Sequence, residues 1–213
     1  MTLREVYQRL DAAWGPQQWW PGESPLEIML GAVLTQNTAW SNVERAIANL
    51  KAAGALSVEA LLALPLDELA GLIRPAGYFN VKARRLRALL EWVRNEGGIE
   101  ALAGWPDASL RTGLLGVHGV GPETADDILL YAFGRPVFVI DAYTRRILGR
   151  LGLVDPAAGY EYLRVVIEAE LGPDVPMYNQ FHALLVAHGK EICRPRPRCA
   201  VCVLREDCPS CVP

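Results

Sequence analysis

The stretch that decides the fold is LLGVHGVGPETAD, residues 114–126, near the middle of the chain. Apolar residues at helical spacing flank a tight turn in which Gly119 and Gly121 lie two positions apart. Glycine adopts a positive φ without strain and lets its backbone approach another surface closely. Pro122 suits the first position of the helix that follows, whose N-terminal amides favour an anion such as a DNA phosphate. The stretch predicts two helices joined by a hairpin, although a turn of this kind also serves purely structural ends.

Helical periodicity continues on both sides of this hairpin. Ser24 and Pro25 form a helix start, in which a capping residue is followed by proline at the first helical position. We expect helices at residues 3–14, 26–34, 43–50, 57–64, 66–73, 80–95, 107–115, 122–133, 141–151, 160–171 and 177–189. Alternating β patterns are almost absent, and the apolar run 137–140 suits an extended segment without an evident strand partner. The predicted fold class is therefore all-α, with a small cysteine-rich tail.

The composition describes a folded protein with local basic patches. The chain has 213 residues, 51 % of them hydrophobic and 21 % charged, which is enough to bury a core in one large or two small domains. It has no membrane-spanning run and no signal peptide, so we expect a cytoplasmic protein, where disulfides are disfavoured. The net charge of −3 does not suit non-specific DNA coating. Cations nevertheless gather at 82–94 and 190–198, as in an enzyme that grips DNA and releases it, although 82–94 also suits a solvated helix face.

Cysteines crowd into the C-terminal tail with the spacing C-x5-C-x2-C-x5-C. They are Cys193, Cys199, Cys202 and Cys208, and Cys211 follows. Thiolates this close together suit a metal centre better than a set of disulfides. The loop between the first two is stiff and cationic, which suits a phosphate backbone as its partner. Its arginines are Arg194, Arg196 and Arg198.

One carboxylate, Asp141, stands at the start of a predicted helix in the sequence Ile140-Asp141-Ala142-Tyr143. Capping the helix N-terminus is the commonest role of an aspartate in that position. The same side chain can also serve a catalytic purpose, so both interpretations stay open from the residues alone.

Seven short motifs follow one another along the chain. They are LTQNT at 34–38, GYFNVKA at 77–83, GVGxxTA at 119–125, FG at 133–134, VID at 139–141, HG at 188–189 and the cysteine tail. Together they resemble the endonuclease III branch of the helix-hairpin-helix DNA glycosylase superfamily. The resemblance implies two helical domains with a DNA groove between them. One is a six-helix barrel at about 22–135, with the helix-hairpin-helix at about 113–125, and the other is a discontinuous iron–sulfur cluster domain of residues 1–21 and 136–213.

The resemblance also implies the partner and the cofactor. The partner is double-stranded DNA with a damaged base or an abasic site, and the damaged base is flipped out of the helix; we expect a monomer with no membrane association. A [4Fe–4S] cluster would be bound by Cys193, Cys199, Cys202 and Cys208. The family has six residues between its first two ligands and this chain has five. A set running from Cys199 to Cys211, or zinc in place of the cluster, is the alternative. We expect a structural cluster that pins the arginine loop against the DNA backbone.

Bifunctional members of that family carry a lysine two residues after the second hairpin glycine, and its amine forms a Schiff base with the sugar and cleaves the strand. Glu123 occupies this position here, and a carboxylate cannot form a Schiff base. We therefore predict a monofunctional glycosylase in which, by resemblance, Asp141 stabilises the cationic sugar as the glycosidic bond breaks. A bifunctional glycosylase and AP lyase acting on oxidised pyrimidines, and a non-catalytic module that binds damaged DNA, are the alternatives.

Bulky aromatic residues point to the substrate. Trp19, Trp20 and Trp40 lie in segments that, with Glu123, resemble bacterial 3-methyladenine glycosylases. Aromatic surface suits an electron-poor alkylated purine, so we expect a substrate pocket here; core packing of the tryptophans and an exposed acid in the first helical turn are the alternatives. Gln36 matches a family position that fills the hole left by the flipped base. The hairpin residues expected to contact DNA are His118, Gly119, Val120 and Gly121.

Overall fold

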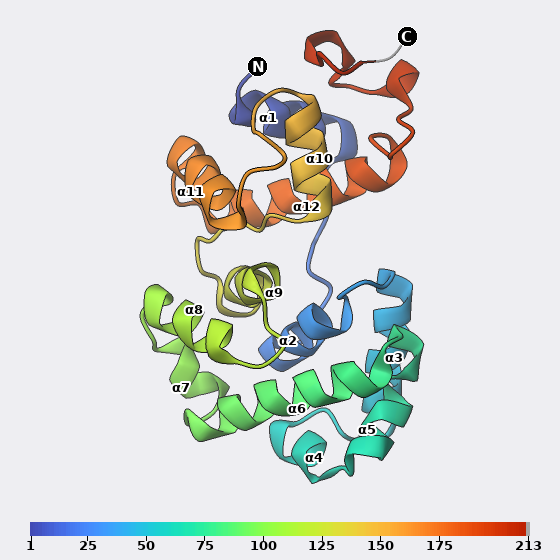
Figure 1. The fold of residues 1–213 in the computed structure, drawn as a ribbon, viewed down its shortest axis with the longest axis vertical. Helices are drawn as coiled ribbons and strands as arrows, with labels where there is room; N and C mark the ends of the chain where they lie inside the picture. Colours follow the sequence, from blue (N-terminus) through green and yellow to red (C-terminus); the bar gives the residue numbers. More distant parts are fainter. Residues whose placement is uncertain (212–213) are drawn as a thin grey trace. The chain divides into compact units, whose positions relative to one another are not determined.

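The computed structural model describes residues 1–211, and across these residues it is all-α, with no strand. This confirms the predicted fold class. The α-helices are α1 (Leu3–Trp14), α2 (Pro25–Leu34), α3 (Trp40–Ala52), α4 (Val58–Ala63), α5 (Leu66–Leu72), α6 (Phe79–Asn95), α7 (Ile99–Ala103), α8 (Asp107–Gly116), α9 (Pro122–Asp127), α10 (Ala142–Arg150), α11 (Tyr160–Leu171) and α12 (Val175–Glu191) (Figure 1). The shorter turns are η1 (Arg74–Ala76), η2 (Ile128–Ala132), η3 (Cys199–Val201) and η4 (Arg205–Asp207).

The described chain divides into two compact units. The hairpin unit is residues 21–135 and contains α2 to α9 with η1 and η2. The terminal unit combines residues 1–20 with 136–211, so the two ends of the chain belong to the same unit. Within it, α1 packs against α11 and α12, far away in the sequence.

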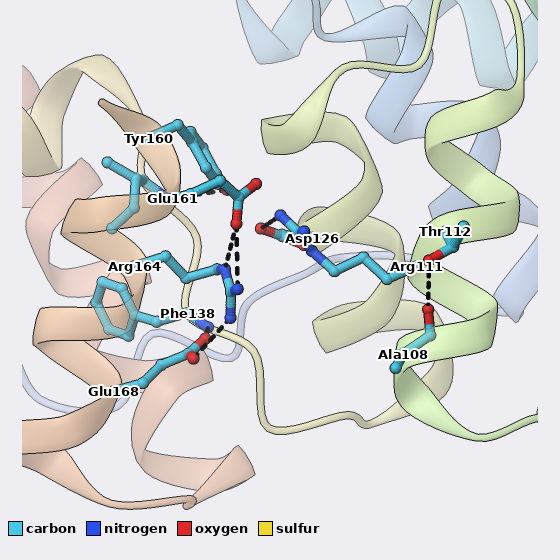
Figure 2. Close-up of polar contacts among 10 residues, drawn as sticks. Ala108, Arg111, Thr112, Asp126, Phe138, Tyr160, Glu161, Arg164 and Glu168 are labelled. Carbon is cyan, nitrogen blue, oxygen red and sulfur yellow. Dashed lines mark hydrogen bonds and ion pairs between the residues drawn. The ribbon is translucent and has the colours of Figure 1, made fainter.

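The hairpin unit is built around α2. Every residue of α2 after Pro25 is buried, because the helix is apolar except for Glu27 and contacts α3, α6, α9 and η2. Ser24 caps it as predicted, and its Oγ accepts from the amide of Glu27 at 3.2 Å. Across the hairpin, Arg111 of α8 donates two hydrogen bonds, of 2.7 and 3.1 Å, to the carboxylate of the fully buried Asp126 of α9 (Figure 2).

The terminal unit packs α12 against α1 and α10. Phe138 contacts Tyr178 and Phe181 edge to face, with ring centroids 5.3 and 5.7 Å apart. The apolar run 137–140 is buried outside any helix, and no strand pairs with it within residues 1–211. Its amides bond to side chains instead: Phe138 N donates to Glu168 at 2.9 Å, and Arg164 holds the other oxygen of that carboxylate at 2.7 Å (Figure 2).

Two local features differ from the sequence-based expectation. The short helix α7 was not predicted, because five residues are too few to establish a helical period. The predicted helix 122–133 is α-helical only to Asp127 and then widens into the π-turn η2. In residues 1–211 no helix combines the length and the apolar character that a membrane crossing requires.

Candidate active site and metal centre

Asp141 lies at the start of α10 and is buried, with 9 % of the residue exposed. Its Oδ1 accepts from the amide of Thr144 at 2.7 Å, so the capping role expected from sequence is present. Its Oδ2 lies 3.6 Å from Nε2 of His182, a buried residue of α12. Burial raises the pKa of Asp141, but His182 and the Thr144 amide more than offset this and hold the pKa below its usual value. The site therefore presents an ionised carboxylate in a dry environment.

The hairpin turn joins α8 to α9, and its two glycines differ. Gly119 has a φ of +87°, and a Cβ there would lie 2.2 Å from Cγ of Arg85. Gly121 has an ordinary extended backbone, and a Cβ there would meet nothing within 4 Å. The conformation and packing of the turn therefore require glycine at position 119, whereas the space beside Gly121 is open.

The other hairpin residues divide into exposed and packed. His118 and Glu123 are exposed, as a contact with DNA would require. Val120 is buried, and its amide already donates to Val117 O at 3.1 Å. Neither the side chain nor the backbone amide of Val120 is therefore available for the predicted contact with DNA. For Glu123, exposure in the first turn of α9 agrees with the simpler of its two interpretations.

Gln36 is held within the protein. Its Nε2 donates to Gly119 O at 3.2 Å and to Thr124 Oγ1 at 2.9 Å, while its Oε1 accepts from Arg85. Filling the hole left by a flipped base would require these bonds to break. The next residue, Asn37, is exposed and has a left-handed φ of +55°.

The predicted substrate pocket draws on both units. Trp19 and Trp20 belong to the terminal unit, where their rings lie 5.6 Å apart and Lys190 sits 5.7 Å from the Trp19 ring. Trp40 belongs to the hairpin unit and donates to Glu44 one turn along α3 at 3.1 Å. All three tryptophans are partly exposed. A pocket that combines them stays a prediction.

The thiols of the tail all line one cavity. They are Cys193, Cys199, Cys202, Cys208 and Cys211. The thiols surround this space rather than meet at a point: among residues 1–211, no three His, Cys, Asp or Glu side chains form a group suited to a single metal ion. Five thiols around one cavity fit an iron–sulfur cluster, whose usual ligands are cysteine thiolates.

Polar side chains of neighbouring helices contact these sulfurs. Arg150 of α10 donates to Cys193 Sγ at 3.3 Å, and Nε2 of His188 of α12 lies 3.4 Å from Cys202 Sγ. Burial lowers the pKa of His188 to about 4, so its ring is neutral at physiological pH. Burial is also the main cause that raises the pKa of Cys202, which a bound metal would reverse. These contacts suit thiolate ligands.

The arginine loop follows the first of these cysteines. Arg194, Arg196 and Arg198 are all exposed. Arg150 fixes the backbone of this loop, because it donates hydrogen bonds to the carbonyls of Arg194 at 2.6 Å and Pro195 at 2.9 Å. The loop therefore presents its cations to solvent on a braced backbone, although a contact with DNA remains a proposal.

Sequence reasoning placed Lys82 and Arg85 in the basic patch at 82–94 and gave His182 no part in the site, whereas Lys82 is buried inside the protein. For Lys82 a signal existed, since Lys82, Leu86, Leu89 and Val93 share one buried stripe of α6. A lysine on such a stripe is buried and needs acceptors. No local pattern pairs Arg85 with Gln36, or His182 with Asp141, because these partners are distant in sequence.

Comparison with known proteins now identifies the family. Residues 30–170 match the HhH-GPD superfamily, described as base excision DNA repair proteins. The chain is 44 % identical over 211 residues to "Putative DNA repair glycosylase MJ1434" of Methanocaldococcus jannaschii, covering 98 % of this chain and 96 % of that protein. It is 31 % identical over 194 residues to endonuclease III of Haemophilus influenzae, covering 87 % and 83 % of the two chains. The chain therefore belongs to the HhH-GPD superfamily of base excision DNA repair proteins, and with it to the DNA glycosylases.

Solved structures agree with this assignment. The 3-methyladenine DNA glycosylase MagIII of H. pylori, bound to 1,N6-ethenoadenine, superposes with a TM-score of 0.79 at 28 % identity, covering 90 % of this chain and 98 % of that one. An endonuclease III–DNA complex superposes with a TM-score of 0.83 at 20 % identity, covering 99 % and 96 % of the two chains. The second likeness establishes the fold alone.

Proposed function

We propose that this glycosylase is monofunctional and hydrolyses the N-glycosidic bond of an alkylated purine in double-stranded DNA. The observation that carries the proposal is Glu123, which stands in the hairpin where lyases of the family have their lysine. A carboxylate cannot attack the sugar to form a Schiff base. The product would be an abasic site in an unbroken strand.

The three lysines of the chain support this proposal, because each has other partners. Lys51 pairs with two glutamates at 3.0 Å, and Lys82 is buried and donates to two backbone carbonyls. Lys190 lies over the ring of Trp19. None of the three stands in the hairpin.

Asp141 is proposed as the catalytic residue. A buried, ionised carboxylate stabilises the positive charge that develops on the deoxyribose as the bond to the base breaks. The low pKa of Asp141 keeps it negative at neutral pH. It would also orient or deprotonate the water that attacks the sugar.

Alkylated purines are proposed as substrates because such a base carries positive charge and leaves without a general acid. Partly exposed tryptophan surface suits stacking on a base of that kind. The similarity to MagIII, a 3-methyladenine DNA glycosylase, supports the same substrate class.

Cys193, Cys199, Cys202 and Cys208 are proposed to hold a [4Fe–4S] cluster. When bound, the cluster supplies a covalent crosslink of the tail, which has little core of its own. The contacts of Arg150 would then fix the arginine loop, with Arg194, Arg196 and Arg198 offered to the DNA backbone.

Base release from a panel of duplexes tests the proposal. The panel carries alkylated purines, oxidised pyrimidines, uracil and mismatched thymine, and each reaction is analysed with and without alkali. We expect strand breaks at alkylated purines after alkali only. Breaks without alkali, together with a DNA adduct trapped by borohydride, would contradict the monofunctional assignment. Binding without any base release would contradict an enzymatic role.

A further inference from the structure

Two cations one turn apart on α6 tie together separate segments of the hairpin unit. Lys82 is only 2 % exposed, and its Nζ donates to Leu34 O at 2.9 Å and to Ala76 O at 2.8 Å. Leu34 ends α2 and Ala76 ends η1. One ammonium group therefore fixes the starting points of the two loops that follow these elements. One of these loops contains Gln36.

Arg85 makes the second tie, from the same face of α6. Its guanidinium donates to Oε1 of Gln36, whose Nε2 donates in turn to Gly119 O and Thr124 Oγ1. The aliphatic part of Arg85 also fills the space where Gly119 lacks a side chain. Both Oε1 and Nε2 of Gln36 are thereby hydrogen-bonded, so the orientation of its side-chain amide is fixed.

We propose that Arg85 is a positioning residue that holds the hairpin turn, through Gln36 and by packing on Gly119, in its DNA-binding conformation before DNA arrives. The inference rests on the proposed function, in which the chain acts on damaged double-stranded DNA, and on the expectation that the hairpin binds a DNA phosphate. A turn that is ordered in advance loses less conformational freedom when DNA binds, so the affinity is higher. In the DNA-free chain, Gln36 is the link between Arg85 and the hairpin.

The alternative role for Arg85 is direct contact with a phosphate, and substitutions distinguish the two. Arg84 is a matched control, because it is the neighbouring cation on α6 and is exposed. Arg85→Ala and Arg84→Ala remove the same charge, but only the first removes the contacts with Gln36 and Gly119. Arg85→Lys keeps the charge and loses the guanidinium nitrogen that bonds Gln36.

Affinity is measured for a duplex with a tetrahydrofuran abasic analogue over a range of salt concentrations. We expect Arg85→Ala and Arg85→Lys to weaken binding about tenfold, with the salt dependence unchanged, and Arg84→Ala to weaken it less than about threefold. Single-turnover base release at saturating enzyme should change little, because the lost energy belongs to binding. Rescue by lysine, or a salt slope reduced by about one in Arg85→Ala, would mean direct phosphate contact and overturn the proposal.

Hydrogen exchange of the hairpin amides, measured without DNA, separates this inference from the proposed function. We expect exchange at residues 118–121 to accelerate about tenfold in Arg85→Ala and in Gln36→Ala, with no further increase in the double variant. Exchange should stay at the wild-type rate in Arg84→Ala. Unchanged exchange in Arg85→Ala would overturn the positioning role whether or not the protein releases bases, whereas an inactive wild type with this exchange pattern would overturn the proposed function alone.

Discussion

The two hairpin glycines are required for different reasons, which makes them separable by substitution. Gly119→Ala forces an alanine into a positive φ and against Arg85, so we expect a loss of about 1–3 kcal/mol in the free energy of unfolding. Gly121→Ala fits its extended backbone and meets no neighbour, so stability should be retained or rise slightly. Its methyl group would nevertheless occupy the open space that a phosphate is proposed to enter. Thermal unfolding and affinity for an abasic-analogue duplex check both expectations; unimpaired binding by Gly121→Ala would contradict a close approach there.

Asp141 combines a structural and a proposed catalytic role, and Asp141→Asn separates them. Asparagine caps helices as well as aspartate does, so the bond from the Thr144 amide should survive and the melting temperature should stay within about 2 °C. The negative charge is lost, and single-turnover base release should fall at least about 100-fold. An unchanged rate on a lesion that the wild type hydrolyses would remove Asp141 from the mechanism.

His182 should set the pH range over which Asp141 works. His182 and the Thr144 amide lower the pKa of Asp141 against the effect of burial, so the carboxylate stays ionised until the pH falls below its usual titration range. Replacing His182 by leucine removes one of these partners and raises the pKa of Asp141. The acid limb of base release should therefore move to higher pH, with the rate above pH 8 much less affected. His182→Gln keeps a hydrogen-bond donor beside Asp141 and should shift the limb less; a limb that stays in place in both variants would contradict this role.

Among the helices, α6 organises the hairpin unit, and Lys82 should leave a signature in the pH dependence of its stability. Burial, with a smaller contribution from Arg85, lowers the pKa of Lys82 from 10.5 to about 8. The folded chain therefore loses this proton near pH 8 and the unfolded chain only near 10.5, so the unfolded state binds more protons in between. Stability gained from this group should rise with pH over that window, by up to about 1.4 kcal/mol per pH unit.

Lys82→Met provides the comparison for that expectation. It should lack the rise, and it should be less stable at pH 7 by about 1–3 kcal/mol because two buried carbonyls lose their donor. Urea unfolding between pH 7 and pH 10 measures both effects, and other titrating groups cancel in the difference between the variants. Parallel curves for the two proteins would mean that Lys82 keeps its proton throughout.

Local sequence signals predicted most of these elements, but not the contacts between them. The stripes that mark α1, α6 and α12, and the caps at Ser24 and Asp141, are encoded within a few residues and were found correctly. The π-turn η2 was missed because its residues are apolar all round and carry no period that favours one helix type. The ties from Lys82, Arg85 and His182 were missed because each joins residues brought close only by packing, and propensity does not describe packing.

At the scale of the whole molecule, the chain closes its terminal unit with residues from both of its ends. Trp14 of α1 packs on His188 of α12, with ring centroids 6.1 Å apart, and His188 in turn reaches Cys202. Arg146 and Arg150 of α10 bond to the backbone or sulfur of Cys193 at 2.8 and 3.3 Å. The cysteine tail is thus held by contacts with α10 and α12, so loss of a bound cluster should lower the stability of the whole terminal unit.

The ligands of the proposed cluster can be distinguished by two serine variants, because the two candidate sets differ only in Cys193 and Cys211. We expect Cys193→Ser to lose iron and sulfide, to lose the visible absorption of an iron–sulfur protein and to unfold at a lower temperature. Cys211→Ser should keep about four irons and four sulfides per chain with the absorption intact, since its thiol is then dispensable. The reverse pattern would move the cluster to the set that begins at Cys199. Zinc in place of iron in the purified protein would replace the cluster by a structural ion, and it would leave the bracing of the arginine loop by Arg150 in place.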